Sequence, residues 1–223
     1  MQFIEYRDAG VMMTALAGQI ADELRVALSE GESAALAVPG GTTPGPIFDV
    51  LSQADLDWAR VFVLLTDERW VPESSERSNT RLLRQRLLTG PAAKAQLVPL
   101  YAPAERPEEV LPVLAAGLAP HLPLDVVLLG MGADMHTASI FPGADLLDAA
   151  LNGDELLLPM RAPGAPEPRI TLSAAVLRAA KTRHIVITGA AKRAAFERAQ
   201  SLPSSEAPVA AVLPGATIHW AES

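Results

Sequence analysis

The sequence predicts an α/β fold with a doubly wound, mainly parallel sheet covered by helices on both faces, as in Rossmann-like proteins. Short apolar runs without polar alternation, typical of strands buried on both faces, are separated by segments with helical periodicity. In addition, each apolar run leads directly into glycine and polar residues, as expected where parallel strands end at a ligand site.

Four apolar runs are expected to form strands, and five amphipathic segments between them are expected to form helices. The expected strands are residues 34–38, 61–66, 125–129 and 184–188. The expected helices are residues 12–29, 79–88, 108–119, 173–180 and 191–200. Residues 162–168 contain three prolines and a glycine, and we expect a loop there.

The composition limits the classes of partner. The 223 residues contain no linker-like segment, which predicts one domain over residues 1–223. The net charge of −8 disfavours nucleic acid or an anionic membrane as main partner, but allows a small anionic ligand. Without cysteine there is no disulfide, thiolate nucleophile or cysteine-bound metal. Without a signal-peptide pattern or a run of about 18 apolar residues, a cytoplasmic location is expected.

Four clusters of glycine and polar residues follow the predicted strands, at residues 39–44, 67–69, 130–132 and 189–192. Because the carboxyl ends of parallel strands meet at one edge of a sheet, we expect these clusters to converge on one ligand site.

The first cluster has the features of an anion-binding turn. Gly40 and Gly41 allow backbone N–H groups to approach a ligand closely, and Thr42 and Thr43 add hydroxyl groups before a helix N-terminus. Pro44 fits the first helical turn. The alternative is an ordinary tight turn with a threonine N-cap. The pattern is neither G-x-G-x-x-G nor a Walker loop, so a dinucleotide or ATP is not indicated.

The second cluster combines carboxylates with arginine. Asp67 could contact sugar hydroxyls or a reacting centre, and Arg77 could bind an anion through both arms of its guanidinium group. Ser78 or Asn79 is a plausible N-cap for the helix that follows. A solvated charged loop is the preferred interpretation for three residues taken singly: Glu68, Arg69 and Glu73.

Residues 130–143 form the densest cluster and contain His136. A histidine beside an aspartate at a strand end, here Asp134, can act as a general base near neutral pH. A lone histidine is more often structural, but the convergent setting favours catalysis for His136. The other three histidines lack such neighbours and are interpreted as surface or packing residues: His121, His184 and His219.

Two cations are expected near the same edge of the sheet, Arg169 and Lys192. Lys192 lies in the first turn of a predicted helix, where the helix dipole disfavours a positive charge. A bound anion would remove that conflict, whereas the alternative is a lysine that extends into solvent.

Together these motifs resemble the 6-phosphogluconolactonases, and the resemblance covers nearly the whole chain. Five motifs carry it: Gly-Gly-Thr-Thr-Pro at 40–44, Asp-Glu-Arg-Trp-Val-Pro at 67–72 with Ser-Asn at 78–79, the block at 130–143, Arg-Ile-Thr-Leu at 169–172, and Gly-x-x-Lys at 189–192. Each motif is moderately specific, and all five in this order are highly specific.

The resemblance implies hydrolysis of 6-phospho-D-glucono-1,5-lactone to 6-phospho-D-gluconate in the oxidative pentose phosphate pathway, without a metal or organic cofactor. It implies that His136 activates water, and that Asp67 and Asp134 orient the sugar or His136. The groups implied to hold the phosphate or the developing oxyanion are Arg77, Arg169, Lys192, Gly40, Gly41, Thr42 and Thr43. The only expected partner is the small sugar-phosphate lactone, bound by a monomer or small homo-oligomer.

One position departs from the family pattern, because Met135 stands where the family usually has glycine. Methionine rarely adopts a positive φ. We therefore expect either an ordinary backbone at Met135 or a strained one that lets its side chain cover the pocket.

Two other functions are weighed against the lactonase. The glucosamine-6-phosphate deaminase/isomerase group shares the glycine loop, but its Asp-Glu segment lacks Arg-Trp-Val-Pro and a different run follows its Asp-x-His. A sugar-phosphate sensor would carry a DNA-binding module, which is not expected because the chain starts a few residues before its first predicted helix.

Overall fold

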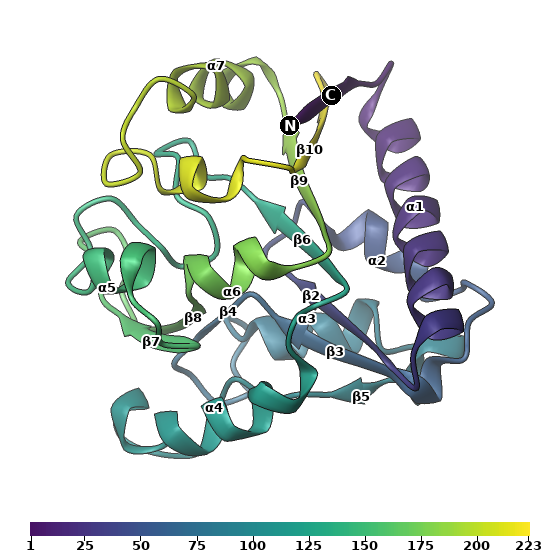
Figure 1. The fold of residues 1–223 in the computed structure, drawn as a ribbon, viewed down its shortest axis with the longest axis horizontal. Coiled ribbons are helices and arrows are strands. Elements are labelled where there is room, and N and C mark those ends of the chain that lie inside the picture. The colour runs from purple at the N-terminus through teal and green to yellow at the C-terminus, as the bar shows by residue number, and fades with distance from the viewer.

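The computed structural model describes all residues from Met1 to Ser223, and a seven-stranded sheet forms its centre (Figure 1). Its strand order is β1-β10-β9-β6-β2-β3-β5, and every neighbouring pair is parallel. The strands are β1 (Gln2–Glu5), β2 (Ala34–Val38), β3 (Val61–Leu65), β5 (Gln96–Leu97), β6 (Val126–Gly130), β9 (Thr182–Thr188) and β10 (Thr217–Ala221). This arrangement confirms the doubly wound α/β fold.

Helices cover both faces of this sheet. They are α1 (Ala9–Glu30), α2 (Gly45–Leu51), α3 (Asn79–Arg86), α4 (Leu111–Leu118), α5 (Leu147–Asn152), α6 (Ala174–Ala179) and α7 (Ala190–Ala199). Figure 1 shows α1 and α7 on opposite sides of β9 and β10. The expected helix at 108–119 begins later, at Leu111, so that Pro112 falls in the first turn, where no N–H is needed. None of the helices has the length and hydropathy to cross a bilayer.

A second, antiparallel sheet was not expected from the sequence. It has the order β4-β8-β7 and contains β4 (Asp67–Arg69), β8 (Arg169–Leu172) and β7 (Leu157–Met160). The residue between β3 and β4, Thr66, donates its backbone N–H to Val38 and accepts one from Leu172, so it joins the two sheets. The charged cluster at 67–69 is therefore a strand and not a solvated loop.

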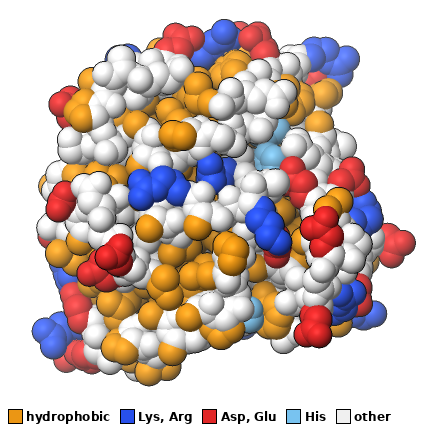
Figure 2. Space-filling view, in the orientation of Figure 1, with side chains coloured by type: hydrophobic (Ala, Val, Ile, Leu, Met, Phe, Trp, Pro, Cys, Tyr) orange, Lys and Arg blue, Asp and Glu red, His pale blue; other side chains and the backbone are white.

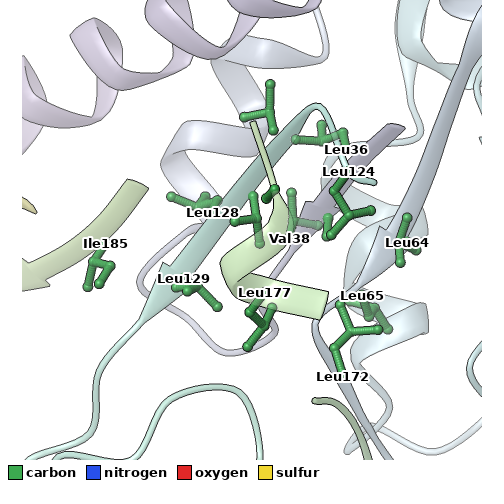
Figure 3. Packing of buried hydrophobic residues seen from close by; sticks show 14 of the residues in the cluster. Leu36, Val38, Leu64, Leu65, Leu124, Leu128, Leu129, Leu172, Leu177 and Ile185 are labelled. Carbon is green, nitrogen blue, oxygen red and sulfur yellow. The ribbon is translucent and has the colours of Figure 1, made fainter. Parts of the chain in front are cut away.

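One hydrophobic cluster of 62 buried residues includes side chains from both sheets. Figure 3 shows Leu65 of β3, Leu129 of β6, Leu172 of β8 and Leu177 of α6 in this packing. On the face shown in Figure 2, apolar side chains also gather at the surface over the lower part, where α4 lies.

A chain of buried and partly buried polar side chains connects α1 to the C-terminal strands. Tyr6 Oη lies 2.8 Å from His219 Nδ1, and His219 Nε2 lies 3.0 Å from His184 Nδ1. The other ring nitrogen of His184 lies 2.8 Å from Glu23 on α1. His184 and His219 are buried packing residues, as the sequence predicted. Burial, reinforced by the neighbouring His184, lowers the pKa of His219 to about 4.

Acid should destabilise the folded chain through His219. Below its unfolded pKa of 6.5, His219 binds a proton in the unfolded chain but not in the folded chain, until the pH approaches 4. The folded state should therefore lose about 3 kcal/mol between pH 6.5 and 4 through this group, and nothing through it above pH 6.5.

Urea denaturation at several pH values would measure this loss. His219→Gln, which cannot titrate, should show a shallower decline in unfolding free energy than the unmodified chain between pH 6.5 and 4. Parallel curves for the two proteins would contradict the assignment.

Candidate active site

A cavity of about 450 Å³ opens at the carboxyl ends of the central strands. From β2 the chain continues outward to β3 and β5, whereas β6 continues to β9 and β10 on the other side. The direction of winding therefore reverses between β2 and β6, and ligands in open α/β sheets bind at such a point. Pro39 after β2 and Gly130 at the end of β6 both line the cavity.

The structure brings most of the predicted site residues to this cavity. Those that line it are Gly40, Gly41, Thr42, Thr43, Asp67, His136, Arg169 and Lys192. Asp134 does not line it but contacts His136 directly. Of the predicted site residues, only Arg77 neither lines the cavity nor contacts another predicted site residue.

His136 and Asp134 form a hydrogen-bonded pair. Nδ1 of His136 lies 2.5 Å from Oδ1 of Asp134, and the same carboxylate oxygen accepts the backbone N–H of His136 at 3.3 Å. The side-chain hydrogen bond from His136 is the main cause that lowers the pKa of Asp134. The Phe141 ring lies against the imidazole, with 4.4 Å between ring centroids. With Nδ1 engaged, Nε2 is the imidazole atom left to accept a proton.

The backbone around His136 forms a tight hairpin. Gly132 and His136 pair through a backbone hydrogen bond of 3.0 Å, and the three residues between them make the turn. The last residue of such a loop is left-handed and usually glycine. Here Met135 has φ +66°, a conformation that costs a non-glycine residue about 1–2 kcal/mol.

Of the two outcomes expected from the sequence, Met135 has the strained backbone. Its side chain, however, does not line the cavity. It is partly buried against the hydrophobic core, and its carbonyl accepts the Val209 N–H at 3.0 Å. Ala138, two residues beyond His136, also has a positive φ, +49°.

Asp67 is buried and holds the segment that follows His136. Its carboxylate accepts hydrogen bonds from Ser139 Oγ at 2.5 Å and from Thr66 Oγ1 at 3.2 Å. Nη1 of Arg169 lies 3.9 Å from the same carboxylate. Asp67 can therefore orient both a cation and the loop that contains His136.

Arg69 is a cavity residue that sequence reasoning missed. It lies directly opposite Arg169 in the β4–β8 ladder, and both line the cavity. The buried Nε atoms of both guanidinium groups have no hydrogen-bond partner, and burial lowers the pKa of Arg169. Like charges opposite each other destabilise a sheet, so an anion between them would supply charge and acceptors together. On the face in Figure 2, several basic side chains lie near the middle, while other basic side chains and most of the acidic ones lie toward the outline.

Arg77 lies on the surface, where its guanidinium group pairs with Glu167. Its backbone carbonyl accepts a hydrogen bond of 2.9 Å from Nη1 of Arg69. Arg77 therefore contacts the cavity only through Arg69. Successive side chains of a strand point to opposite sides. If residues 67–69 had been recognised as a strand, this alternation would have placed Arg69 and Glu68 on opposite sides of it.

Residues at the start of two helices, α2 and α7, line the cavity. The N-cap of α2 is Pro44, and no side chain donates or accepts a capping hydrogen bond. The alternative interpretation of this segment, a tight turn with a threonine N-cap, is therefore wrong. Gly41 has φ +86°, and a Cβ atom on Gly40 would lie 2.1 Å from the Asn79 side chain. Lys192 lies in the first turn of α7, as the sequence predicted. No group of three or more His, Asp and Glu side chains is arranged to hold a metal ion.

Comparison with known proteins gives consistent results. Residues 7–220 match the family described as glucosamine-6-phosphate isomerases/6-phosphogluconolactonase. The 6-phosphogluconolactonase of Pseudomonas aeruginosa is 46% identical over 215 residues, covering 92% of this chain and 88% of that protein. That of Mesorhizobium japonicum is 44% identical, with 97% and 93% covered. The crystal structure of a 6-phosphogluconolactonase from Shewanella baltica matches with a TM-score of 0.96 at 32% identity, covering 99% of this chain and 97% of that one.

The hairpin geometry predicts that Gly132→Ala removes activity without unfolding the chain. A Cβ atom at position 132 would lie 2.2 Å from His136 Nδ1 and 2.4 Å from Asp134 Oδ1, so the pair must separate. We expect turnover to fall by about 100-fold, as for loss of a general base. Gly117→Ala on α4 is the matched control, because its Cβ would meet no atom within 4 Å and the residue does not line the cavity. Equal turnover in the two variants would contradict this reading of the turn.

Proposed function

The chain belongs to the family of glucosamine-6-phosphate isomerases and 6-phosphogluconolactonases, and we propose that it hydrolyses 6-phospho-D-glucono-1,5-lactone to 6-phospho-D-gluconate in the oxidative pentose phosphate pathway. The observation that carries the proposal is one cavity that joins a histidine–carboxylate pair to three cations. The cations are Arg69, Arg169 and Lys192.

His136 acts as the general base. The Asp134 carboxylate holds the proton on Nδ1 and stabilises the imidazolium that forms, which leaves Nε2 to take a proton from water. The water oxygen attacks the lactone carbonyl carbon, and the C1–O5 bond then breaks. The imidazolium returns its proton to the ring oxygen, and the product acid releases the second water proton as it ionises. A lactone is already labile, so a general base that contributes about 10²–10⁴-fold is a substantial aid.

The cations and the glycine loop hold the phosphate and the developing oxyanion. Arg169, Lys192 and residues 40–43 all line the cavity, and their cationic side chains and backbone N–H groups suit a dianion. We assign to Arg69 the direct contact with substrate that the sequence placed at Arg77, because Arg69 lines the cavity. Holding the remote phosphate fixes the reacting carbon against His136.

Hydrolysis is favoured over deamination of an amino sugar phosphate. The relatives compared above are lactonases, and this chain keeps the Arg-Trp-Val-Pro run after Glu68 and the Thr-Ala-Ser run after His136. Asp67 accepts from Ser139 of that second run, so both motifs meet at one carboxylate.

We propose that residues 1–223 act as a single hydrolase domain, since both sheets share one core. No metal or organic cofactor takes part in the steps above, and the only ligand they require is the sugar-phosphate lactone. The reaction belongs in the cytoplasm, because a charged sugar phosphate does not cross membranes unaided. A monomer or small homo-oligomer suffices, because every group in the steps above comes from one chain.

A coupled assay of lactone opening, corrected for the spontaneous rate, tests this function. His136→Ala should lower kcat by about 10²–10⁴-fold, whereas Lys192→Ala should mainly raise KM. Near-normal turnover by His136→Ala would move the base to another group, with Asp67 first. No acceleration by the unmodified protein, together with ammonia release from glucosamine 6-phosphate, would overturn the lactonase assignment.

The assignment of Arg69 predicts a difference between two neighbouring arginines. Arg69→Gln should raise KM by about 10-fold or more, because hydrogen bonds to a charged group contribute about 1.5–3 kcal/mol. Arg77→Gln removes the same charge outside the cavity, and its KM should stay within about twofold of the unmodified value. A larger effect at Arg77 than at Arg69 would restore the sequence-based assignment.

A further inference from the structure

The three residues of β4 alternate between two sides of the strand. Asp67 and Arg69 face the cavity, whereas Glu68 between them points away from it. Glu68 is nevertheless fully buried, with 0% of its surface exposed. Burying a carboxylate costs free energy unless hydrogen bonds from the protein replace those from water, so Glu68 requires donors within the fold.

Five donors surround the Glu68 carboxylate. Oε1 accepts the backbone N–H groups of Arg69 at 2.7 Å and Asn79 at 2.8 Å. Oε2 accepts Ser78 Oγ at 3.1 Å, and both the N–H and Oγ1 of Thr80 at 2.7 Å. The carboxylate thus lies at the N-terminus of α3, where free N–H groups and the helix dipole favour a negative charge.

The first turn of α3 in turn supports the glycine loop of the cavity. Asn79 is its first residue, and its Nδ2 donates a hydrogen bond of 3.1 Å to the backbone carbonyl of Asp67. The same side chain lies so close to Gly40 that no Cβ would fit between them. Asn79 and Gly40 both line the cavity.

We propose that Glu68 is a positioning residue for substrate binding, which acts through Asn79 on the glycine loop and through the backbone on Arg69. Its carboxylate fixes the start of α3, the start of α3 fixes Asn79, and Asn79 fixes Gly40. Since residues 40–43 and Arg69 bind substrate only under the function proposed above, this role rests on that function.

The identity of the side chain follows from the donors. All five partners donate, so the site requires a group that accepts at both oxygens. Glutamine has the same shape, but its amide nitrogen would face at least one backbone N–H whichever way it is turned, because Oε1 accepts two such groups and Oε2 accepts that of Thr80. Glu68→Gln therefore disturbs the start of α3 while it leaves His136 and Asp134 untouched.

Kinetics of Glu68→Gln test the proposal. We expect KM to rise by about 10-fold, and kcat to stay within about threefold, because the base is on another loop. The matched control is Leu24→Ala, a buried change on α1 that lowers stability but should leave KM unchanged. An unchanged KM in Glu68→Gln, or an equal rise in Leu24→Ala, would overturn the proposal.

A double-mutant cycle distinguishes positioning from general destabilisation. If Glu68 acts mainly through Asn79, Glu68→Gln combined with Asn79→Ala should raise KM little more than the larger single change. A KM increase equal to the product of the two single increases would overturn this route.

A milder pair of variants keeps the test valid if Glu68→Gln fails to fold. Thr80→Val keeps the side-chain shape but removes one donor to Glu68, whereas Thr80→Ser keeps the donor. We expect KM to rise about threefold in the valine variant and to remain normal in the serine variant. Equal KM values in the two would overturn the proposal.

Calorimetric titration with 6-phosphogluconate and with inorganic phosphate separates this proposal from the proposed function. Weaker binding of both by Glu68→Gln than by the unmodified chain supports the positioning role, even if lactone hydrolysis is absent. Equal binding, in a protein that hydrolyses the lactone, leaves the proposed function intact and overturns the positioning role.

Discussion

Pairing of β4 with β8 places Arg69 directly opposite Arg169, so two cations share one buried wall of the cavity. Neither Nε atom has a partner, and the charge of Arg169 is offset only in part, by Asp67 at 3.9 Å and more weakly by Glu167. Such a wall is unfavourable by itself and becomes favourable when an anion lies between the guanidinium groups. The ligand preference of the cavity therefore follows from a strand register.

The two sheets are joined at Thr66, and each determines a different property of the cavity. The parallel sheet fixes where the cavity lies, because the winding reverses between β2 and β6. The antiparallel sheet supplies Asp67, Arg69 and Arg169, which together with Lys192 of α7 give the cavity its charge. Side chains alternate along a strand, so β4 directs Asp67 and Arg69 toward the cavity and directs Glu68 to the opposite side, at the start of α3.

The sequence predicted what local patterns determine. Continuous apolar runs identified β2, β3, β6 and β9, and the residues after them identified most of the cavity lining. The second sheet was missed because its strands have only three or four residues, and β4 is entirely charged. That omission explains the treatment of Arg69 as a solvated residue, since its direction depends on a pairing with residues one hundred positions away.

In the turn before His136, positions 132 and 135 differ in whether they tolerate a residue other than glycine. At position 132 the constraint is space, because a Cβ atom would occupy the place of the imidazole and the Asp134 carboxylate. At position 135 the constraint is only a positive φ, which costs about 1–2 kcal/mol. Packing of Met135 on the core and its hydrogen bond to Val209 can offset a cost of that size. A steric overlap with His136 and Asp134 cannot be offset in this way, because one of these side chains would have to move, so the pair requires glycine at 132 but not at 135.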